Sequence, residues 1–170
     1  MSSSILGIDP GSKGGIVTIN PKTLKVLYAA KTPIDIKEKV GRIENFANTC
    51  LIGYAFIEMP LFFMPRQMKD GTKFSSSNAA GKLGKSQGEW YGILNCFLDD
   101  VFELSPATVK KFLKTQTKIS GKASYKELSR AYTDSIPSFK AHTYGPRGGW
   151  QDGISDAICI AMAGYWQQQN

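Results

Sequence analysis

The segment GIDPGSKGG, residues 7–15, places Asp9 directly after a short apolar run and follows it with a proline and a glycine-rich turn. Two functional interpretations are open at this point. Asp9 ends a strand and presents its carboxylate to a metal ion, or the backbone amides of the glycine-rich loop wrap a phosphate. A third interpretation is structural, because Asp before Pro and Gly is a common turn former.

Composition and charge indicate the broad class of the protein. The 170 residues suit a single domain over residues 1–170, and 42% hydrophobic residues with 17 glycines indicate a globular protein. The N-terminal segment lacks the basic region of a secretory signal, and its apolar run is too short to cross a membrane. We therefore expect a soluble, cytoplasmic protein. The net charge of +7 favours a polyanionic partner such as nucleic acid.

The three cysteines, Cys50, Cys96 and Cys159, are widely spaced and odd in number. This spacing argues against a disulfide framework and against a zinc site. We expect reduced residues that lie in the core.

Hydrophobic periodicity predicts an α/β fold with the element order β-β-β-α-β-α-β-α-α-α. The expected strands span residues 4–9, 15–20, 24–31, 54–59 and 101–105. The first three are expected to form an antiparallel meander. The expected helices span residues 38–52, 78–98, 106–114, 123–133 and 151–167, and residues 60–77 and 135–150 are expected to be irregular. The last helix is expected to bury one face, formed by Ile154, Ile158, Ala161 and Tyr165.

Four acidic residues occupy positions from which they can converge. Asp9 ends the first expected strand, and Glu58 ends the fourth. Asp152 and Asp156 lie one turn apart on the same face near the start of the last expected helix. If the first and fourth strands are neighbours, these like charges gather, and only protonation or cations relieve their repulsion.

Oxygen ligands without nearby histidine suit Mg²⁺, with Mn²⁺ as a substitute. Two such ions per site would support hydrolysis of a phosphodiester. Each acid also has a structural explanation: a turn former, a strand end that reaches solvent, or favourable charges near a helix N-terminus. What favours the metal site is that all four positions are able to converge.

Most of the positive charge lies between residues 106 and 130. The basic residues there are Lys110, Lys111, Lys114, Lys118, Lys122, Lys126 and Arg130. They predict contacts with a phosphate backbone, although a solvated helix face has the same pattern. Lys13, Lys82 and Lys85 are further candidates for such contacts.

The expected loop at residues 60–77 carries four large apolar side chains, Phe62, Phe63, Met64 and Phe74. They either plug the core or stack on unpaired bases as wedges. His142 is the only histidine, and we expect a structural role for it.

Five segments, in this order and spacing, resemble the RuvC family of Holliday-junction resolvases in the ribonuclease H-like superfamily. They are GIDPGSKGGI (7–16), FIEMP (56–60), SNAAGKLGKSQG (77–88), SPATVKKF (105–112) and DGISDAICIAMA (152–163). The resemblance covers nearly the whole chain. It implies a central mixed five-stranded sheet, with three antiparallel and then two parallel strands, flanked by helices. It also implies a homodimeric, magnesium-dependent endonuclease that cuts two opposed strands of a four-way DNA junction.

The resemblance assigns the family's acids to Asp9, Glu58 and Asp156. The family's neighbouring acid lies three residues before the last one, where this chain has Gly153, so Asp152 is a near match. Lys110 matches the family's basic residue in the Pro-x-x-Val-Lys element.

Two family positions differ in this chain. The second family lysine falls on Tyr125, and Lys126 is the expected substitute. The family aromatic three residues after Glu58 falls on Leu61, so Phe62 or Phe63 takes that role. These departures suggest a divergent member of the family, such as a phage-encoded one.

Three rival functions remain. Actin-like and sugar-kinase ATPases also begin with Gly-Ile-Asp-x-Gly and a hairpin, but they enclose ATP between two lobes, and this chain has the length of one. A DNA-binding module without catalysis conflicts with the presence of all four acids. A relative that cuts RNA or simpler branched DNA is the third. We expect a metal-dependent, structure-selective DNA endonuclease whose dimer interface includes the helix around Gly84, Gly88 and Tyr91.

Overall fold

The computed structural model of the protein describes residues 3–49, 51–59, 77–119 and 121–170. Its strands are β1 (Ser4–Ile8), β2 (Gly15–Asn20), β3 (Lys25–Lys31), β4 (Ile52–Glu58) and β5 (Val101–Leu104). Its helices are α1 (Ile36–Thr49), α2 (Ser77–Phe97), α3 (Pro106–Thr117), α4 (Tyr125–Ser135), α5 (Pro137–Thr143) and α6 (Asp152–Gln169).

The strands form one mixed sheet with the order β3-β2-β1-β4-β5. β1, β2 and β3 pair antiparallel, whereas β4 pairs parallel with both β1 and β5. The predicted arrangement of three antiparallel strands followed by two parallel strands is therefore confirmed. The turn between β2 and β3 forms because the Asn20 side chain accepts hydrogen bonds from the amides of Lys22 and Thr23, at 3.1 and 3.2 Å.

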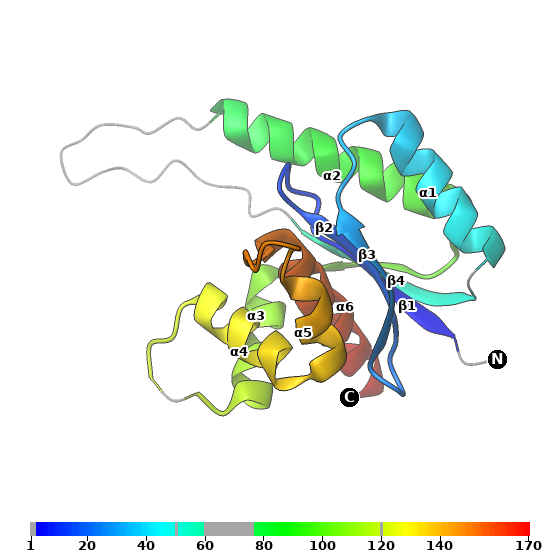
Figure 1. Ribbon diagram of the computed structural model, residues 1–170. Coiled ribbons are helices and arrows are strands. Elements are labelled where there is room, and N and C mark those ends of the chain that lie inside the picture. Colours follow the sequence, from blue (N-terminus) through cyan, green and yellow to red (C-terminus); the bar gives the residue numbers. More distant parts are fainter. Residues whose placement is uncertain (1–2, 50, 60–76, 120) are drawn as a thin grey trace.

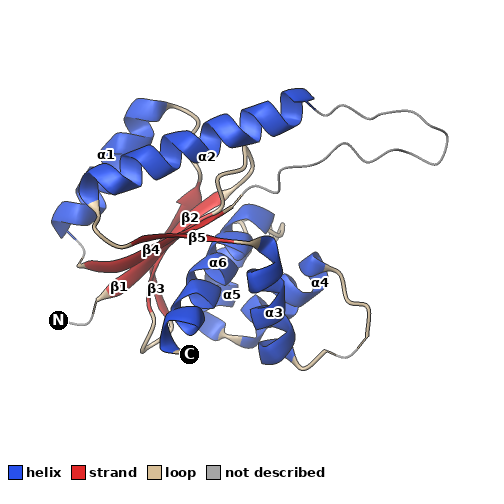
Figure 2. Ribbon diagram, turned by 180° about the vertical axis from the view of Figure 1, so that it is seen from behind, coloured by secondary structure: helices blue, strands red, loops and turns tan. Residues whose placement is uncertain are grey.

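Helices cover both faces of the sheet (Figures 1 and 2). α1 and α2 lie on one face, over a core that includes Leu6 and Trp90. α3 to α6 lie on the other face, over a core that includes Phe112 and Ile158. β1 and β2 are buried along almost their whole length because both of their faces are covered.

The backbone of α6 approaches β1 and the turn before β2 very closely. A Cβ atom on Gly7 in β1 would lie 2.3 Å from the carbonyl oxygen of Ala157. At the start of α6, a Cβ on Gly153 would lie 2.1 Å from the carbonyl oxygen of Lys13, and one on Gly15 would lie 2.4 Å from that of Gly153. Real Cβ atoms do not come this close to backbone, so these contacts require glycine. They seat the start of α6 beside the turn that joins β1 to β2.

The segment 135–150, predicted to be irregular, contains the helix α5. This prediction was wrong because the helix is short and is stabilised by burial of Phe139, whose ring lies 6.0 Å from that of Tyr132. Pro137 occupies the first turn, where its fixed φ angle favours a helix and its missing amide hydrogen costs nothing.

The predicted start of α3 is confirmed, since Ser105 caps the helix by accepting a hydrogen bond from the amide of Thr108 at 3.2 Å.

Other predictions of burial need correction. α6 does not bury a single face: every residue from Gly153 to Gly164 is buried except Asp156, because the helix lies between the sheet and α3 to α5. α1 ends at Thr49, and Leu51, predicted to lie in that helix, is exposed. Cys159 is buried as expected, whereas Cys96 is exposed and Cys50 lies outside the described residues.

One face of α2 is open. A Cβ added at Gly84, Gly88 or Gly92 would meet no described atom within 4 Å, and Tyr91 beside them is 40% exposed. The glycines therefore make no close contact in the part of the chain that the structure describes.

None of the helices among the described residues is long and apolar enough to cross a membrane.

Gly7→Ala tests the close packing of the α6 backbone against β1. We expect the free energy of unfolding to fall by about 1–3 kcal/mol, because the added methyl overpacks a rigid backbone contact. Urea denaturation measures the change. Gly41→Ala is the matched control, because an added Cβ at this exposed position in α1 would meet nothing within 4 Å. It should raise stability by up to about 1 kcal/mol through helix propensity. A Gly7→Ala variant as stable as the wild type would show that the contact between β1 and α6 can accept a methyl group.

Candidate active site

Asp9 follows β1 in a tightly bonded turn. Its side-chain Oδ1 accepts a hydrogen bond from the amide of Gly11 at 3.0 Å, and its carbonyl oxygen accepts one from the hydroxyl of Thr32 at 2.8 Å. The hydroxyl of Ser86 in α2 donates to the carbonyl oxygen of Pro10 at 2.7 Å. The turn is therefore bonded both to the residue that follows β3 and to α2.

The same turn bears on the phosphate-loop interpretation. The amide of Gly11 bonds to Asp9, and the amide of Gly14 bonds to the carbonyl oxygen of Gly11 at 2.9 Å. Gly14 and Gly15 are also covered by the start of α6, through an isolated parallel bridge from Gly14 to Gly153. A phosphate would need such amides free, so the geometry favours Asp9 as a ligand over the loop as a phosphate cradle.

Glu58 lies beside Asp9. β1 and β4 are parallel neighbours, and Ile8 is paired with Ile57. The residue that follows each of these isoleucines is an acid. Asp9 and Glu58 therefore lie side by side at the carboxyl ends of two neighbouring strands, which form one edge of the sheet. This is the convergence that the sequence predicted.

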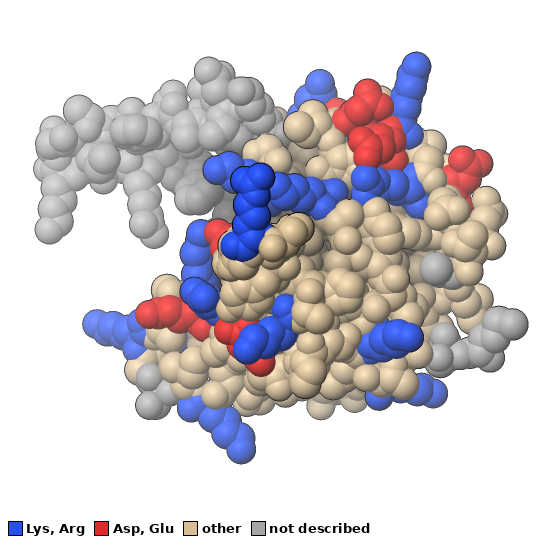
Figure 3. Space-filling model, in the orientation of Figure 1, with Lys and Arg blue, Asp and Glu red and all other residues tan. Residues whose placement is uncertain are grey.

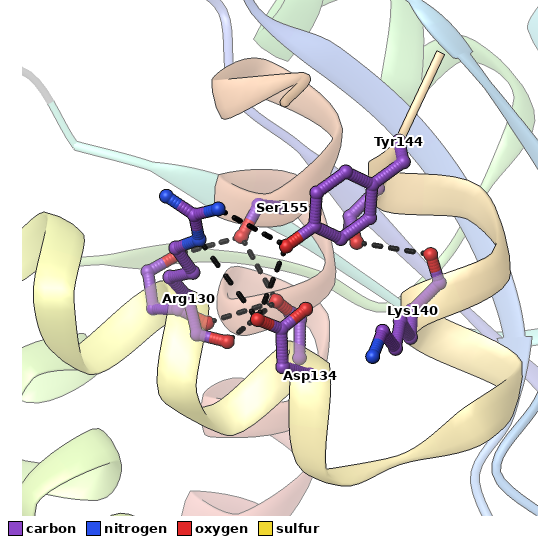
Figure 4. Close-up of polar contacts among 8 residues, drawn as sticks. Arg130, Asp134, Lys140, Tyr144 and Ser155 are labelled. Carbon is purple, nitrogen blue, oxygen red and sulfur yellow. Dashed lines mark hydrogen bonds and ion pairs between the residues drawn. The ribbon is translucent and has the colours of Figure 1, made fainter. Parts of the chain in front are cut away.

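Asp156 is the third acid at this edge, and it is held by a buried polar network between α4 and α6. The Ser129 hydroxyl donates to Asp156 Oδ1 at 3.2 Å and lies 2.7 Å from the hydroxyl of Ser155. The Cys159 thiol donates to the Ser129 hydroxyl at 3.4 Å. Figure 4 shows Ser155 directed from α6 toward α4. The network fixes the rotation of α6 that turns Asp156 toward the sheet edge.

A second set of contacts fixes the segment before α6 (Figure 4). The Tyr144 hydroxyl donates to Asp134 Oδ2 at 3.1 Å and accepts from the Arg130 guanidinium at 3.3 Å. Arg130 also lies over the ring of Trp150, 5.2 Å from its centroid. Arg130, one of the cations predicted to contact phosphate, thus joins α4 to Tyr144 and Trp150, which pair with each other in an isolated antiparallel bridge.

The three acids disturb one another's ionisation. Burial, followed by the charges of Asp9 and Asp156, raises the pKa of Glu58 to about 7. Burial, followed by the charge of Asp9, likewise raises the pKa of Asp156 to about 7. Burial raises the pKa of Asp9, against the opposing effect of its bond from Gly11. Like charges therefore meet in a poorly solvated place, which is typical of functional carboxylates.

Asp152 differs from the other three acids. Its side chain is 47% exposed, and its Oδ2 accepts a hydrogen bond from the ammonium of Lys126 at 2.6 Å. This bond raises the pKa of Lys126. The structure thus places Lys126, a predicted phosphate contact, in an ion pair with a predicted metal ligand. Asp152 still contributes to the raised pKa of Asp156, so it lies at the margin of the cluster.

The donor set suits a divalent cation. Among the described residues, no group of three or more His, Cys, Asp or Glu side chains forms a ready-made metal site. Mg²⁺ does not need one, because it keeps several waters and is commonly bound by one or two carboxylates plus phosphates of the substrate. Asp9, Glu58 and Asp156 offer only carboxylate oxygens and carry a mutual repulsion that a cation would relieve. The chemistry of these donors therefore fits a hard divalent cation.

An open pocket of about 400 Å³ exposes the acids to solvent. Glu58 and Asp156 line it together with Lys110 and Tyr125. Lys110 was predicted as a phosphate contact, whereas Tyr125 was not assigned a role. The only signal for Tyr125 in the sequence was its place where the resembling family has a lysine.

A second open pocket, of about 480 Å³, continues along α3 and shares Lys110 with the first. It is lined also by Lys111 and Lys114, so a row of cations leads to the acids. Lys118, at the end of α3, and Lys122 are exposed in the segment before α4. Because α3 ends at Thr117, the predicted stripe is broken between two helices, as the sequence indicated.

Some of the remaining residues predicted to contact DNA lie within the described residues, and others lie outside them. Lys13 is exposed in the turn after Asp9, and Lys85 lines a pocket with Pro10 and Gly11 on that same turn. Phe62, Phe63, Met64 and Phe74 lie outside the described residues, as does the side chain of Lys82. In the view of Figure 3, lysines and arginines are scattered among acidic side chains rather than gathered in one patch.

Comparison with solved structures identifies the fold. No protein-family model matches the sequence, and no curated protein matches it significantly. The fold matches Thermus thermophilus RuvC in complex with a Holliday junction substrate, with a TM-score of 0.62, 18% identity, and coverage of 98% of this chain and 95% of that one. A second T. thermophilus RuvC structure gives a TM-score of 0.62, 20% identity and the same coverage.

The yeast mitochondrial Holliday junction resolvase matches with a TM-score of 0.60 and 12% identity, over 99% of this chain and 80% of that one. At such identities the likeness shows the fold. The chain therefore has the ribonuclease H-like α/β fold that the sequence predicted, and its structural neighbours are RuvC and the yeast resolvase.

Glu58→Gln tests the electrostatic coupling. The pKa of Glu58 lies near 7 when folded and has an ordinary value of 4.5, so the folded state binds the extra proton and loses stability as pH rises between these values. We expect the variant to be more stable than the wild type above about pH 7 in the absence of metal, with an advantage that shrinks toward pH 4.5. Thermal unfolding across this range measures it. A constant difference between the two proteins would show that Glu58 ionises normally.

Proposed function

We propose that the protein is a metal-dependent endonuclease that cleaves branched DNA and resolves four-way junctions by paired phosphodiester hydrolysis. The observation that carries this proposal is the meeting of Asp9, Glu58 and Asp156 at one edge of a resolvase-like sheet, each with a raised pKa. The fold neighbours support it, since two are RuvC and one is a mitochondrial Holliday junction resolvase. The chain from residue 1 to 170 acts as one nuclease domain.

Asp9, Glu58 and Asp156 hold Mg²⁺ or Mn²⁺ through their carboxylate oxygens, and two ions per site are compatible with this number of acids. A bound cation supplies activation of water and stabilisation of the leaving oxygen. Asp152 takes part once Lys126 leaves it for a phosphate of the substrate. Their ion pair is exposed, so its replacement costs little.

The chain's own cations bind and orient the DNA. Lys110 lines the same pocket as Glu58 and Asp156, which supports a contact with the phosphate next to the cut. Lys111 and Lys114 continue the row along α3 and hold the adjoining backbone. Lys13, exposed on the turn after Asp9, and Lys85, exposed on α2, would contact further phosphates of the DNA. These contacts hold a phosphodiester over the carboxylates.

Opposed cuts in one junction require two active sites, so the active form is a homodimer. The open face of α2 around Gly84, Gly88 and Tyr91 supports an interface there, because glycines on an exposed helix are costly unless something packs on them. A related nuclease that cuts RNA or simpler branched DNA would use the same acids. A panel of four-way, three-way and linear substrates distinguishes these functions.

Asp9→Asn tests the catalytic assignment. Loss of one ligand removes several kcal/mol of transition-state stabilisation, so we expect Mg²⁺-dependent cleavage of a synthetic four-way junction to fall by at least about 100-fold. Junction binding in EDTA should survive. The control is Glu44→Gln, which neutralises an exposed acid on α1 and should cleave normally. If Asp9→Asn cuts at the wild-type rate, this cluster is not the active site.

Lys110→Ala tests the phosphate contact. We expect weaker junction binding and a salt dependence reduced by about one unit of slope in a plot of log affinity against log salt concentration. Binding in EDTA at several salt concentrations measures it. Lys37→Ala, an exposed lysine on α1, should leave both quantities unchanged. An unaltered slope for Lys110→Ala would mean that Lys110 contacts no phosphate.

A further inference from the structure

Tyr125 carries a hydroxyl group that nothing yet described explains. It is the first residue of α4, directly after the N-cap Ser124, whose capping box with Glu127 fixes the start of the helix. The side chain is half-buried, and its hydroxyl oxygen is shielded from solvent. That oxygen has no hydrogen-bond partner among the described residues. A shielded, unpartnered hydroxyl is costly and calls for an explanation.

The surroundings of this hydroxyl are anionic. Tyr125 lines the pocket that exposes Glu58 and Asp156. Burial, followed by Cys159 and the charges of Asp156, Glu58 and Asp9, raises the pKa of Tyr125. The phenol therefore keeps its proton and can act as a donor. The neighbouring carboxylates accept hydrogen bonds when ionised. Of the three, Asp156 has the largest effect on the pKa of Tyr125.

Asp156 has a place for a second donor. Ser129 bonds to its Oδ1, which leaves Oδ2 for another partner. Carboxylates that bind metal ions are commonly oriented by such hydrogen bonds, which hold the ligand oxygen in its binding position. Tyr125 and Ser129 both belong to α4, one turn apart, so two donors from one helix approach the same acid.

We propose that Tyr125 is a positioning residue for Asp156, and that its hydroxyl donates a hydrogen bond to the Asp156 carboxylate when a divalent cation occupies the site. The inference rests on the proposed function, because it assumes that Asp156 is a ligand. It gives a function to a shielded hydroxyl that has no partner among the described residues. It also gives a role to the position where the resembling family carries a lysine.

The test is Tyr125→Phe, which keeps the ring and removes only the hydroxyl. Without metal we expect an unfolding temperature equal to or above that of the wild type, because an unpartnered polar atom is lost. The Mg²⁺ concentration that raises the unfolding temperature half-maximally should increase by about 10–100-fold. Cleavage of a four-way junction should need correspondingly more Mg²⁺.

Tyr132→Phe is the matched control. It removes a hydroxyl from the same helix, two turns further on, in a pocket with Leu24 and Trp166 away from the acids. Its Mg²⁺ dependence should equal that of the wild type.

A Tyr125→Phe variant with wild-type Mg²⁺ affinity would overturn the inference while leaving the proposed function intact. A clear loss of stability without metal would also overturn it, because the hydroxyl would then have a structural partner already. A wild-type protein that neither binds Mg²⁺ nor cleaves junctions would overturn the proposed function, and this inference with it.

Discussion

The contact between the backbone of α6 and the first hairpin is the constraint on which the rest of the structure depends. At Gly7, Gly15 and Gly153 any side chain would collide with backbone atoms. Because these positions carry none, α6 lies directly on β1 and begins beside the turn that follows Asp9. Asp156, one turn into the helix, is thereby brought to the strand edge where Asp9 and Glu58 already meet.

This packing creates an electrostatic conflict that the fold does not resolve by itself. Glu58 and Asp156 are both half-buried, and burial together with neighbouring carboxylates raises the pKa of each to about 7. Asp152, at the margin of the cluster, forms an ion pair with Lys126. Such a cluster of buried like charges lowers the stability of the fold, and clusters of this kind are typical of functional sites.

Much of the fold could be predicted from local sequence. Alternating β-branched residues, the Asn20 turn and the Ser105 cap each act within a few residues, so the strands and most helices were found. The convergence of Asp9 and Glu58 could be predicted because both end apolar strands, on the condition, met in the structure, that these two strands are neighbours. α5 was missed because its stability comes from burying Phe139 rather than from periodicity. The all-round burial of α6 was missed because it depends on three other helices.

The finer features of the site could not be predicted for a related reason. The ion pair of Lys126 with Asp152 joins residues 26 positions apart in the sequence, and no local pattern marks it. The place of Tyr125 in the pocket with Glu58 and Asp156 depends on how α4 packs. From sequence alone Arg130 is one more basic residue of the 106–130 segment, yet its guanidinium lies over the Trp150 ring. Side chains whose partners come from distant segments are defined only by the packed structure.

The most direct measurement is the titration of the side-chain carboxyl groups by NMR, with and without Mg²⁺. Without metal, two carboxyl groups, assigned to Glu58 and Asp156 through Glu58→Gln and Asp156→Asn, should titrate near pH 7. Saturating Mg²⁺ should move both midpoints well below that value, because the cation favours the ionised forms. Midpoints that are ordinary for Glu and Asp and do not respond to Mg²⁺ would contradict the assignment of these acids as a metal site.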